Sequence, residues 1–397
     1  MTHVRLKSLV RHVVEKSDGD SHPFVGLEEI ESATGHLLVE NLPLKAASDS
    51  LRHRPGDVLF SKLRPYLAKT YLPTSPGTGT GELLVLRPGP EIDSRFLSYV
   101  TRSAPWLDWA TSTAYGTKMP RTSWELVGNY PTWLPPLEEQ RRISDFLASE
   151  TDRIHELQNR YRHLTALAHE RARAVIDAAL SRSSGEALVP VSATCKAIVD
   201  CVNKTAPTVD GETPYRMIRT SNIRNGEVDL TNTFSVEHST FVEWNRRGAP
   251  RIGDILFTRE APLGQAGILR TDAPVFLGQR IMLYRADEKV MRNDLLLYNF
   301  LGSHMEKQLR LLGAGSLHEH MRVGDGLKLR VHCPPRAHQD ALVQQIDADR
   351  GQCLRLVHLA NRQSALLAER RQALITAAVT GQFDVSTASG RNVTDGV

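Results

Sequence analysis

Residues 134–140 read Leu-Pro-Pro-Leu-Glu-Glu-Gln and open a long helical pattern. Cys333-Pro334-Pro335 opens a second pattern of the same kind, with Pro334 standing 199 positions after Pro135. The two patterns stay in register without a gap, so that Gln140 matches Gln339. Because 199 is about half of the 397 residues, the sequence indicates a tandem duplication of one unit.

The match extends upstream of the helical patterns. Gly56-Asp57-Val58-Leu59-Phe60-Ser61 corresponds to Gly253-Asp254-Ile255-Leu256-Phe257-Thr258 at an offset of 197 residues. Small loop changes explain the difference of two, while the globular parts otherwise differ. This is typical of two copies in which a shared function constrains one surface while another surface has diverged.

The composition fits a soluble globular protein that is large enough for two or more cores, with 41% hydrophobic and 24% charged residues. No apolar run is long enough to span a bilayer, and the start, Met1-Thr2-His3-Val4-Arg5, has no signal-peptide core. We therefore expect a cytoplasmic protein. The four cysteines form no CxxC pair, so we expect free thiols.

The net charge of +4 permits nucleic-acid binding without requiring it. Most of the basic residues are arginine, which suits bidentate contacts to phosphate and guanine better than lysine does.

We expect an α+β fold with two mixed α/β domains, over residues 1–135 and 187–334, and two long helical segments, over residues 136–186 (with a linker) and 335–381. We assign residues 382–397 to a tail, whose composition is small and polar from Ser386 onward. Apolar residues in both helices recur at alternating steps of four and three, which predicts a heptad seam. The seam residues that we expect to pair the helices are Ile143, Leu147, Ile154, Leu157, Leu164, Leu342, Ile346, Leu356, Leu367 and Leu374.

At about 1.5 Å per residue, each helix should be on the order of 65 Å long and should leave its globular domain. An amphipathic helix of that length must bury its apolar stripe on a partner, and its own copy is the best candidate. Pseudo-two-fold symmetry then predicts an antiparallel coiled coil that separates two heads.

These motifs resemble the specificity subunit of type I restriction-modification systems. The resemblance rests on the Gly-Asp-hydrophobic-Leu-Phe-Ser/Thr segment in each half, the helix opening at 134–140, and the helix ending Arg370-Arg371-Gln372-Ala373-Leu374-Ile375-Thr376-Ala377-Ala378-Val379-Thr380-Gly381. The motifs occur twice, in the same order and spacing, over nearly the whole chain. The second copy departs from the pattern with Arg336-Ala337-His338-Gln339, which keeps only the glutamine of Leu-x-Glu-Gln.

The resemblance implies a DNA-reading subunit that does no chemistry and needs no cofactor. Each mixed domain would be a target-recognition domain for one half of a split, asymmetric double-stranded DNA target. The helices would set the unread gap and dock two copies of a methyltransferase subunit, and possible restriction subunits with them.

The residues agree with a non-enzymatic role. The chain has no Asn/Asp-Pro-Pro-aromatic methylation motif and no dinucleotide or P-loop motif. Gly77-Thr78-Gly79-Thr80-Gly81 is the nearest, but it lacks the lysine and the following helix, so it indicates a turn.

A recognition domain holds phosphates with basic and hydroxyl side chains and reads base edges with Arg, Asn, Gln or His. Two loops of the first half and their counterparts in the second half carry such residues. The DNA-binding candidates are Lys62, Arg64, Thr117, Lys118 and Arg121, with Arg219, Asn222, Arg259, Arg280, Ser316, His318, His320 and Arg322 in the second half; Arg216 and Arg224 are further possibilities. The alternative for each residue is a charged side chain that is only solvated, with a neighbouring glycine that serves only the backbone conformation.

Three other interpretations stay open. His318-Glu319-His320 with His332-Cys333 permits a metal site, although histidines on a loop more often face solvent, and we expect no metal. The whole chain permits a coiled-coil adaptor that binds only protein, or an enzyme with an unrecognised site. Salt-dependent, sequence-selective DNA binding separates a DNA-reading subunit from both the adaptor and the enzyme.

Overall fold

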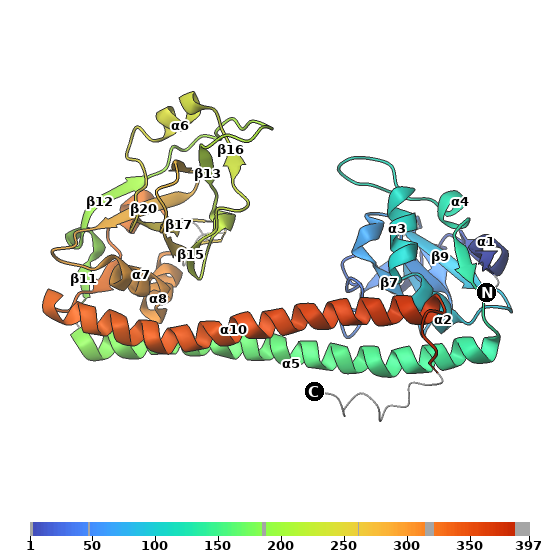
Figure 1. Ribbon diagram of the computed structural model, residues 1–397. Helices are drawn as coiled ribbons and strands as arrows, with labels where there is room; N and C mark the ends of the chain where they lie inside the picture. Colours follow the sequence, from blue (N-terminus) through green and yellow to red (C-terminus); the bar gives the residue numbers. More distant parts are fainter. Residues whose placement is uncertain (1–2, 47, 185–187, 261, 314–320, 386–397) are drawn as a thin grey trace. The chain divides into compact units, whose positions relative to one another are not determined.

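The computed structural model describes residues 3–46, 48–184, 188–260, 262–313 and 321–385 (Figure 1). The chain forms two compact units: unit 1 is Met1–Arg162 with Asn361–Val397, and unit 2 is His163–Ala360. We call the globular parts, residues 3–134 of unit 1 and 188–333 of unit 2, the first and second heads. Across the described ranges, no helix is apolar over enough of its length to cross a membrane.

The first head is built on two sheets. One has the order β2-β9-β6-β7, with β2 (Val10–Val13), β9 (Leu83–Pro88), β6 (Val58–Ser61) and β7 (Thr70–Tyr71). The other has the order β4-β3-β8-β5, with β4 (Leu44–Ala46), β3 (Ser21–Val25), β8 (Gly77–Gly79) and β5 (Leu51–His53). β1 (His3–Arg5) pairs with β10 (Pro131–Trp133), and the helices are α1 (Leu6–Leu9), α2 (Ser94–Val100), α3 (Ala104–Ser112) and α4 (Trp124–Val127).

The second head repeats this plan with more strands in its main sheet. That sheet has the order β12-β20-β17-β18-β15-β14, with β12 (Cys195–Asp200), β20 (Ile281–Ala286), β17 (Ile255–Thr258), β18 (Ala266–Ile268), β15 (Gly226–Val228) and β14 (Ile223–Arg224). The smaller sheet joins β16 (Phe234–Ser235), β13 (Arg216–Ile218) and β19 (Val275–Leu277). β11 (Leu188–Pro190) pairs with β21 (Arg330–His332), and the helices are α6 (His238–Trp244), α7 (Asn293–Leu301), α8 (Ser303–Gly313) and α9 (Val323–Gly326).

The repeated Gly-Asp motif has a structural role at the start of a buried strand. Gly56 has a φ of 86°, a conformation that favours glycine. The buried Asp57 carboxylate accepts hydrogen bonds from Arg87 Nε at 2.7 Å and from Arg54 N at 2.9 Å. In the second head the same contacts join Gly253 (φ 88°), Asp254, Arg285 and Arg251.

The two long helices, α5 (Leu137–Ser184) and α10 (Arg336–Val379), run antiparallel within each unit, as the sequence predicted. In unit 1, Gln158 Nε2 donates to Ser364 O at 2.9 Å, and Arg370 lies 3.8 Å from Glu150, so rising numbers on α5 meet falling numbers on α10. In unit 2, residues 169–176 of α5 line a groove with residues 350–354 of α10, and residues 171–182 line another with 345–349.

The buried face of each helix departs from the heptad frame. On α10 it follows Ile346, Cys353 and Ala360 and then shifts to Arg371, Ile375 and Ala378, instead of the expected Leu367 and Leu374, which are half-buried. On α5 it includes Ile143, Leu147 and Ile154 and continues through Ala168, Ala172 and Ile176. An α-helix has 3.6 residues per turn, so it drifts about 20° per heptad from a 3.5-residue repeat. The expected seam residues Leu164 and Leu356 stand 39% and 48% exposed, although the buried residues on both sides of them, Ile154 and Ala168 on α5 and Cys353 and Ala360 on α10, keep the heptad frame.

Much of the buried face packs against the heads. Ile143, Leu147 and Ile375 belong to the core that contains Phe60 and Trp106 of the first head. Ile176, Leu180, Leu342 and Ile346 belong to the core that contains Phe257 and Tyr284 of the second. In each unit, the pair of long helices thus forms one wall of the core.

One buried glutamine at the start of each long helix clamps that helix to its head. Gln140 Oε1 accepts from Asp93 N at 2.8 Å, while its Nε2 donates to Glu91 O and Pro135 O at 2.9 and 2.8 Å. Gln339 makes the same three hydrogen bonds, at 2.8, 2.8 and 2.9 Å, with Arg292 N, Val290 O and Pro334 O. All these positions are related by 199 residues, which explains why this glutamine is retained where the neighbouring acidic residues are not.

Candidate nucleic-acid interface

Two basic loops of the first head lie side by side. Arg64 N, just after β6, donates to Pro120 O at 2.8 Å. Tyr115 and Arg121 exchange two backbone hydrogen bonds, of 3.0 and 2.9 Å, which close the second loop at its base. We call residues 62–64 and 115–121 together the basic loop pair.

Arg64 is held in a left-handed backbone conformation, with φ 49° and ψ 61°. Such a conformation costs a residue other than glycine on the order of 1 to 3 kcal/mol, and it tends to occur at functional sites. The side chain is exposed, and its Nη2 lies 3.4 Å from Lys118 O. Thr117 and Lys118, at the tip of the neighbouring loop, are exposed as well.

Arg121 is bound by a carboxylate of its own head. Its Nε donates to Glu82 Oε2 at 3.0 Å and its Nη2 to Glu82 Oε1 at 3.1 Å. These charge-assisted bonds raise the pKa of the Arg121 guanidinium, and both side chains are half-buried. The geometry therefore fits a residue that braces the base of the loop better than one that reaches into a DNA groove.

Three large side chains around the basic loop pair are exposed without belonging to the core. Tyr66, Tyr115 and Met119 have exposed fractions of 53%, 66% and 48%. They were not among the candidates from sequence, although large apolar residues in a basic Gly/Pro loop are a signal that points to a binding surface. Apolar and aromatic side chains among cations suit contact with thymine methyl groups and base faces.

The second head places different chemistry in the same frame. Lys62 N donates to Glu82 O at 3.0 Å, and at the equivalent place Arg259 N donates to Arg280 O at 2.8 Å. Arg259 thus takes the position of Lys62, and Arg280 takes that of Glu82. A carboxylate in one head is a guanidinium in the other.

Arg259 is buried, unlike Lys62. Its Nη2 lies 3.2 Å from Asp200 Oδ1 and 3.9 Å from Cys201 Sγ, and its Nη1 lies 3.4 Å from Met321 O. A guanidinium so enclosed braces the edge of the sheet and is not presented to a ligand in this conformation.

Arg280 is exposed and, like Arg64, adopts a left-handed conformation, with φ 71°. Its backbone N donates to Cys201 Sγ at 3.2 Å, and its Nε lies 3.4 Å from Glu260 Oε1. Each head therefore presents one exposed arginine on a strained backbone next to a strand of its main sheet, since Arg64 follows β6 and Arg280 precedes β20.

Arg219 and Asn222 form a turn next to β13. Asn222 is buried, its Oδ1 accepts from Arg219 N at 2.9 Å, and its Nδ2 lies 3.3 Å from Asn232 O. The Arg219 guanidinium stacks 4.1 Å from the centre of the Phe234 ring, which is 43% exposed. Asn222 thus shapes the turn, whereas Arg219 and Phe234 lie at the surface.

The remaining candidates differ in accessibility. Arg322 is exposed and precedes α9, and Arg224 is exposed on β14, whereas Arg216 is half-buried and donates to Ser235 Oγ at 2.7 Å. Ser316, His318 and His320 lie outside the described residues. Within the described ranges, no three His, Cys, Asp or Glu side chains gather at metal-binding distance. His332 is buried and packs edge-on against His304.

Comparison with known proteins adds similarity in sequence and in fold. No family model matches the chain. A stretch of 116 residues is 29% identical to the type I restriction enzyme EcoDI specificity subunit of Escherichia coli. The match covers 29% of this chain and spans about a quarter (26%) of the length of that relative.

Among solved structures, a chain from a study of the assembly and conformational transition of the type I R-M system superimposes with a TM-score of 0.64. It is 21% identical, and the match covers 96% of this chain and 98% of the other. The HsdS subunit from Thermoanaerobacter tengcongensis aligns over 96% and 97% of the two chains at 22% identity, with a TM-score of 0.44. The chain resembles type I specificity subunits in sequence, and it shares its fold with a chain of a type I system.

Proposed function

We propose that this chain is the DNA sequence-recognition subunit of a type I restriction-modification system. Each head reads one half of a bipartite, asymmetric double-stranded DNA target. The long helices dock two copies of a methyltransferase subunit and, where one exists, the restriction subunits. The chain acts in the cytoplasm, performs no methyl transfer or cleavage itself, and requires no cofactor.

One observation carries the proposal: two heads of shared construction present diverged surfaces. The Gln140 and Gln339 clamps and the Asp57 and Asp254 ion pairs are the same in both. The residue that precedes β9 and β20 is not, since Glu82 of one head is replaced by Arg280 in the other. Shared interiors with different basic surfaces are what two readers of different half-sites require.

The helices supply an apolar surface for protein partners. In unit 2, Leu164, Leu167, Leu356 and Leu359 are 39 to 54% exposed on the antiparallel pair. In unit 1, Leu366, the counterpart of Leu167 at an offset of 199, is 47% exposed. Exposed leucines on a helical surface favour a role in protein binding. The internal repeat of Leu167 and Leu366 favours two copies of the partner.

The proposal is tested by exchanging one head. The segment from Ala187 to Cys333 is replaced by the matching segment of a relative, and the methylated sites of cells that carry the partner methyltransferase are sequenced. The expected result is a new second half-site, with the first half-site and the gap unchanged. If both half-sites change together, the heads are not independent readers.

Binding of the purified chain to DNA separates this function from that of an adaptor. Affinity should depend on sequence and should fall steeply with salt, because phosphate contacts release counterions. A chain that binds the methyltransferase but shows no sequence preference for DNA is the coiled-coil adaptor instead. Methyl transfer by the rigorously pure chain would support an enzyme.

A further inference from the structure

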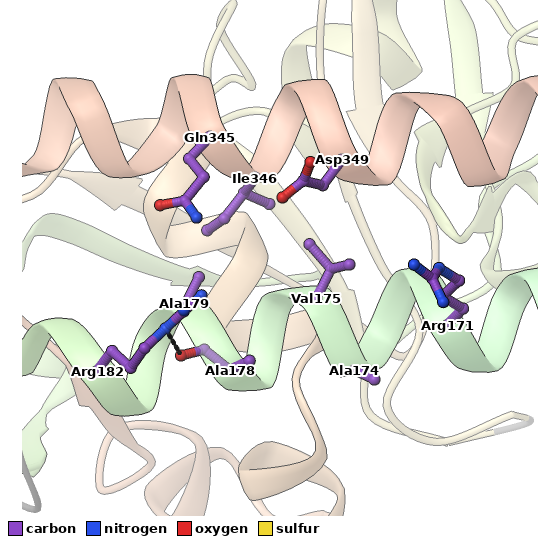
Figure 2. A pocket seen from close by; sticks show the side chains of 9 residues that line it. All are labelled: Arg171, Ala174, Val175, Ala178, Ala179, Arg182, Gln345, Ile346 and Asp349. Atoms are coloured by element: carbon purple, nitrogen blue, oxygen red, sulfur yellow. Dashed lines mark hydrogen bonds between the residues drawn. The ribbon is translucent and has the colours of Figure 1, made fainter.

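A groove of about 250 Å³ lies between α5 and α10 in unit 2 (Figure 2). Its floor is apolar, with Val175, Ala178 and Ile346 facing it. Ala178 is exposed and Val175 is half-buried. Arg171 and Arg182 stand at the two ends of the groove on α5, and Gln345 and Asp349 border it from α10.

Unit 1 has an equivalent place one repeat away. The internal offset of 199 residues relates Val175 to Leu374, Gln345 to Phe146, and Ile346 to Leu147. Leu374, Phe146 and Leu147 all belong to one hydrophobic cluster of unit 1. The same helix positions therefore come together in both units, and the two places can be compared directly.

In unit 1 the chain covers the equivalent place with residues 381–385. Gly381, with a φ of 73°, follows the end of α10, and Gln382 N donates to Ala377 O at 2.9 Å. Phe383 then stacks on Phe146, with ring centres 5.6 Å apart, and joins the cluster with the buried Val385. The covering segment is thus an aromatic residue followed by Asp384 and a valine.

In unit 2 the helix does not permit the same cover. Arg182 occupies the position of Gly381, and α5 continues to Ser184 where α10 has already ended at Val379. Ser184 also takes the place of Phe383, so the sequence offers no aromatic side chain there. The apolar floor formed by Val175 and Ala178 therefore stays accessible in the described part of unit 2.

The charge around the groove matches an acidic ligand. Arg182 Nε donates to Ala178 O at 3.0 Å, which fixes its guanidinium at one end, and Arg171 stands at the other. Asp349 supplies the carboxylate among the described lining residues, so guanidinium groups exceed carboxylates. An aromatic anchor with a neighbouring carboxylate would fill the floor and pair with an arginine.

We propose that this groove binds an extended segment of a partner polypeptide in which an aromatic residue is followed by an acidic one. The segment takes the place that Phe383 and Asp384 take in unit 1. This deepens the proposed function by naming the chemistry of a docking segment, and it rests on that function only for the identity of the partner.

The test uses a fluorescein-labelled peptide with the sequence of residues 380–386, Thr-Gly-Gln-Phe-Asp-Val-Ser, and the full chain without DNA. Fluorescence anisotropy should show saturable binding, and replacing the peptide phenylalanine by alanine should weaken it about tenfold or more. Ala178→Trp, which fills the groove, should abolish binding. Ala166→Trp, at another exposed alanine of α5, should leave it unchanged.

A charge exchange tests the arginines and stands even if Ala178→Trp fails to fold. The double variant Arg171→Glu, Arg182→Glu should bind the parent peptide more weakly. A peptide with lysine in place of its aspartate should regain affinity for this variant. Absence of saturation up to about 1 mM peptide, or equal binding by the Ala178→Trp chain, overturns the proposal. If the chain dimerises and the dimer disappears in Phe383→Ala, the groove is occupied by a second copy of this chain. That result would overturn the proposal that a partner polypeptide occupies it. None of these results depends on DNA reading.

Discussion

Asp177 of α5 and Thr376 of α10 stand at equivalent positions, 199 residues apart, and each caps a helix in the head of the other repeat. Asp177 Oδ1 accepts from Ser303 N at 2.8 Å at the start of α8 in unit 2. Thr376 Oγ1 accepts from Ala104 N at 3.0 Å at the start of α3 in unit 1. Each head is thus bound by the start of its own long helix and by the end of the other one.

These contacts fasten each head to both long helices. Gln140 fixes the first head to the start of α5, and Thr376 fixes it to the end of α10. A helix pair that is built into both cores resists sliding, since a shift of one residue would break the clamp and the cap together.

Removal of a cap should destabilise one unit selectively. Asp177→Ala leaves Ser303 N without its acceptor at the start of α8 and should lower the stability of unit 2 by about 1 to 2 kcal/mol. Urea unfolding combined with hydrogen exchange of α8 and α3 measures this effect. Glu170→Ala, at an exposed position of the same helix, is the control. Equal protection of α8 in both variants would contradict the role of the cap.

Unequal burial predicts unequal effects at two heptad positions of α10. Ile346 is fully buried, so Ile346→Asp should destabilise unit 2 by more than about 3 kcal/mol. Leu356 is 48% exposed, and Leu356→Asp should cost no more than about 1 kcal/mol. Thermal unfolding of the two variants compares them. Similar losses would contradict the difference in burial between the two side chains.

Arg64 should contact DNA through the first head alone. Arg64→Ala should cost about 1 to 3 kcal/mol of binding at one base position if it reads a base, or should lower the salt slope by about one if it holds a phosphate. Methylation-site mapping and binding at several salt concentrations distinguish these cases. Lys7→Ala, at an exposed cation of α1, is the control. A change in the second half-site would contradict independent heads.

Arg280 and Arg322 should act on the second half-site in the same way. Either substitution to alanine should weaken or relax recognition of that half only, because both side chains are exposed on the second head. Arg121→Ala should instead loosen the loop at 115–121, since it releases Glu82. Glu82→Gln, which keeps a hydrogen-bond acceptor, should then mimic Arg121→Ala only weakly.

The buried His53 predicts an acid-sensitive first head. Desolvation lowers its pKa from the ordinary 6.5 to about 4, so the unfolded chain binds a proton before the folded chain does. The stability that depends on neutral His53 is present above about pH 6.5 and is lost as the pH falls towards 4. The loss should be on the order of 2 kcal/mol. Urea unfolding at pH 7 and pH 4.5 should show a shallower pH dependence in His53→Gln than in the parent, and an unchanged slope would contradict this assignment.

Much of the architecture could be predicted from the sequence, because periodicity and repetition are local properties of a chain. The offset of 199 residues paired Gln140 with Gln339 and Asp57 with Asp254, and the structure gives each pair the same contacts. The two long helices and their antiparallel direction also followed from apolar spacing and symmetry. These features depend on which residue types recur, and the sequence contains that information by itself.

Only the tertiary structure decided which members of these patterns are buried or exposed. Accessibility depends on neighbours that are distant in the chain: Asp200 and Met321 enclose Arg259, and Glu82 binds Arg121, although all the basic residues looked alike in sequence. Packing left Leu356 48% exposed and Ala178 beside an uncovered groove. The buried face of α10 leaves the heptad frame beyond Ala360, because 3.6 residues per turn accumulate a rotation that a short motif does not reveal. The sequence determined the repeat and its helices; the packing of each head on those helices determined which surfaces remain for DNA and for partners.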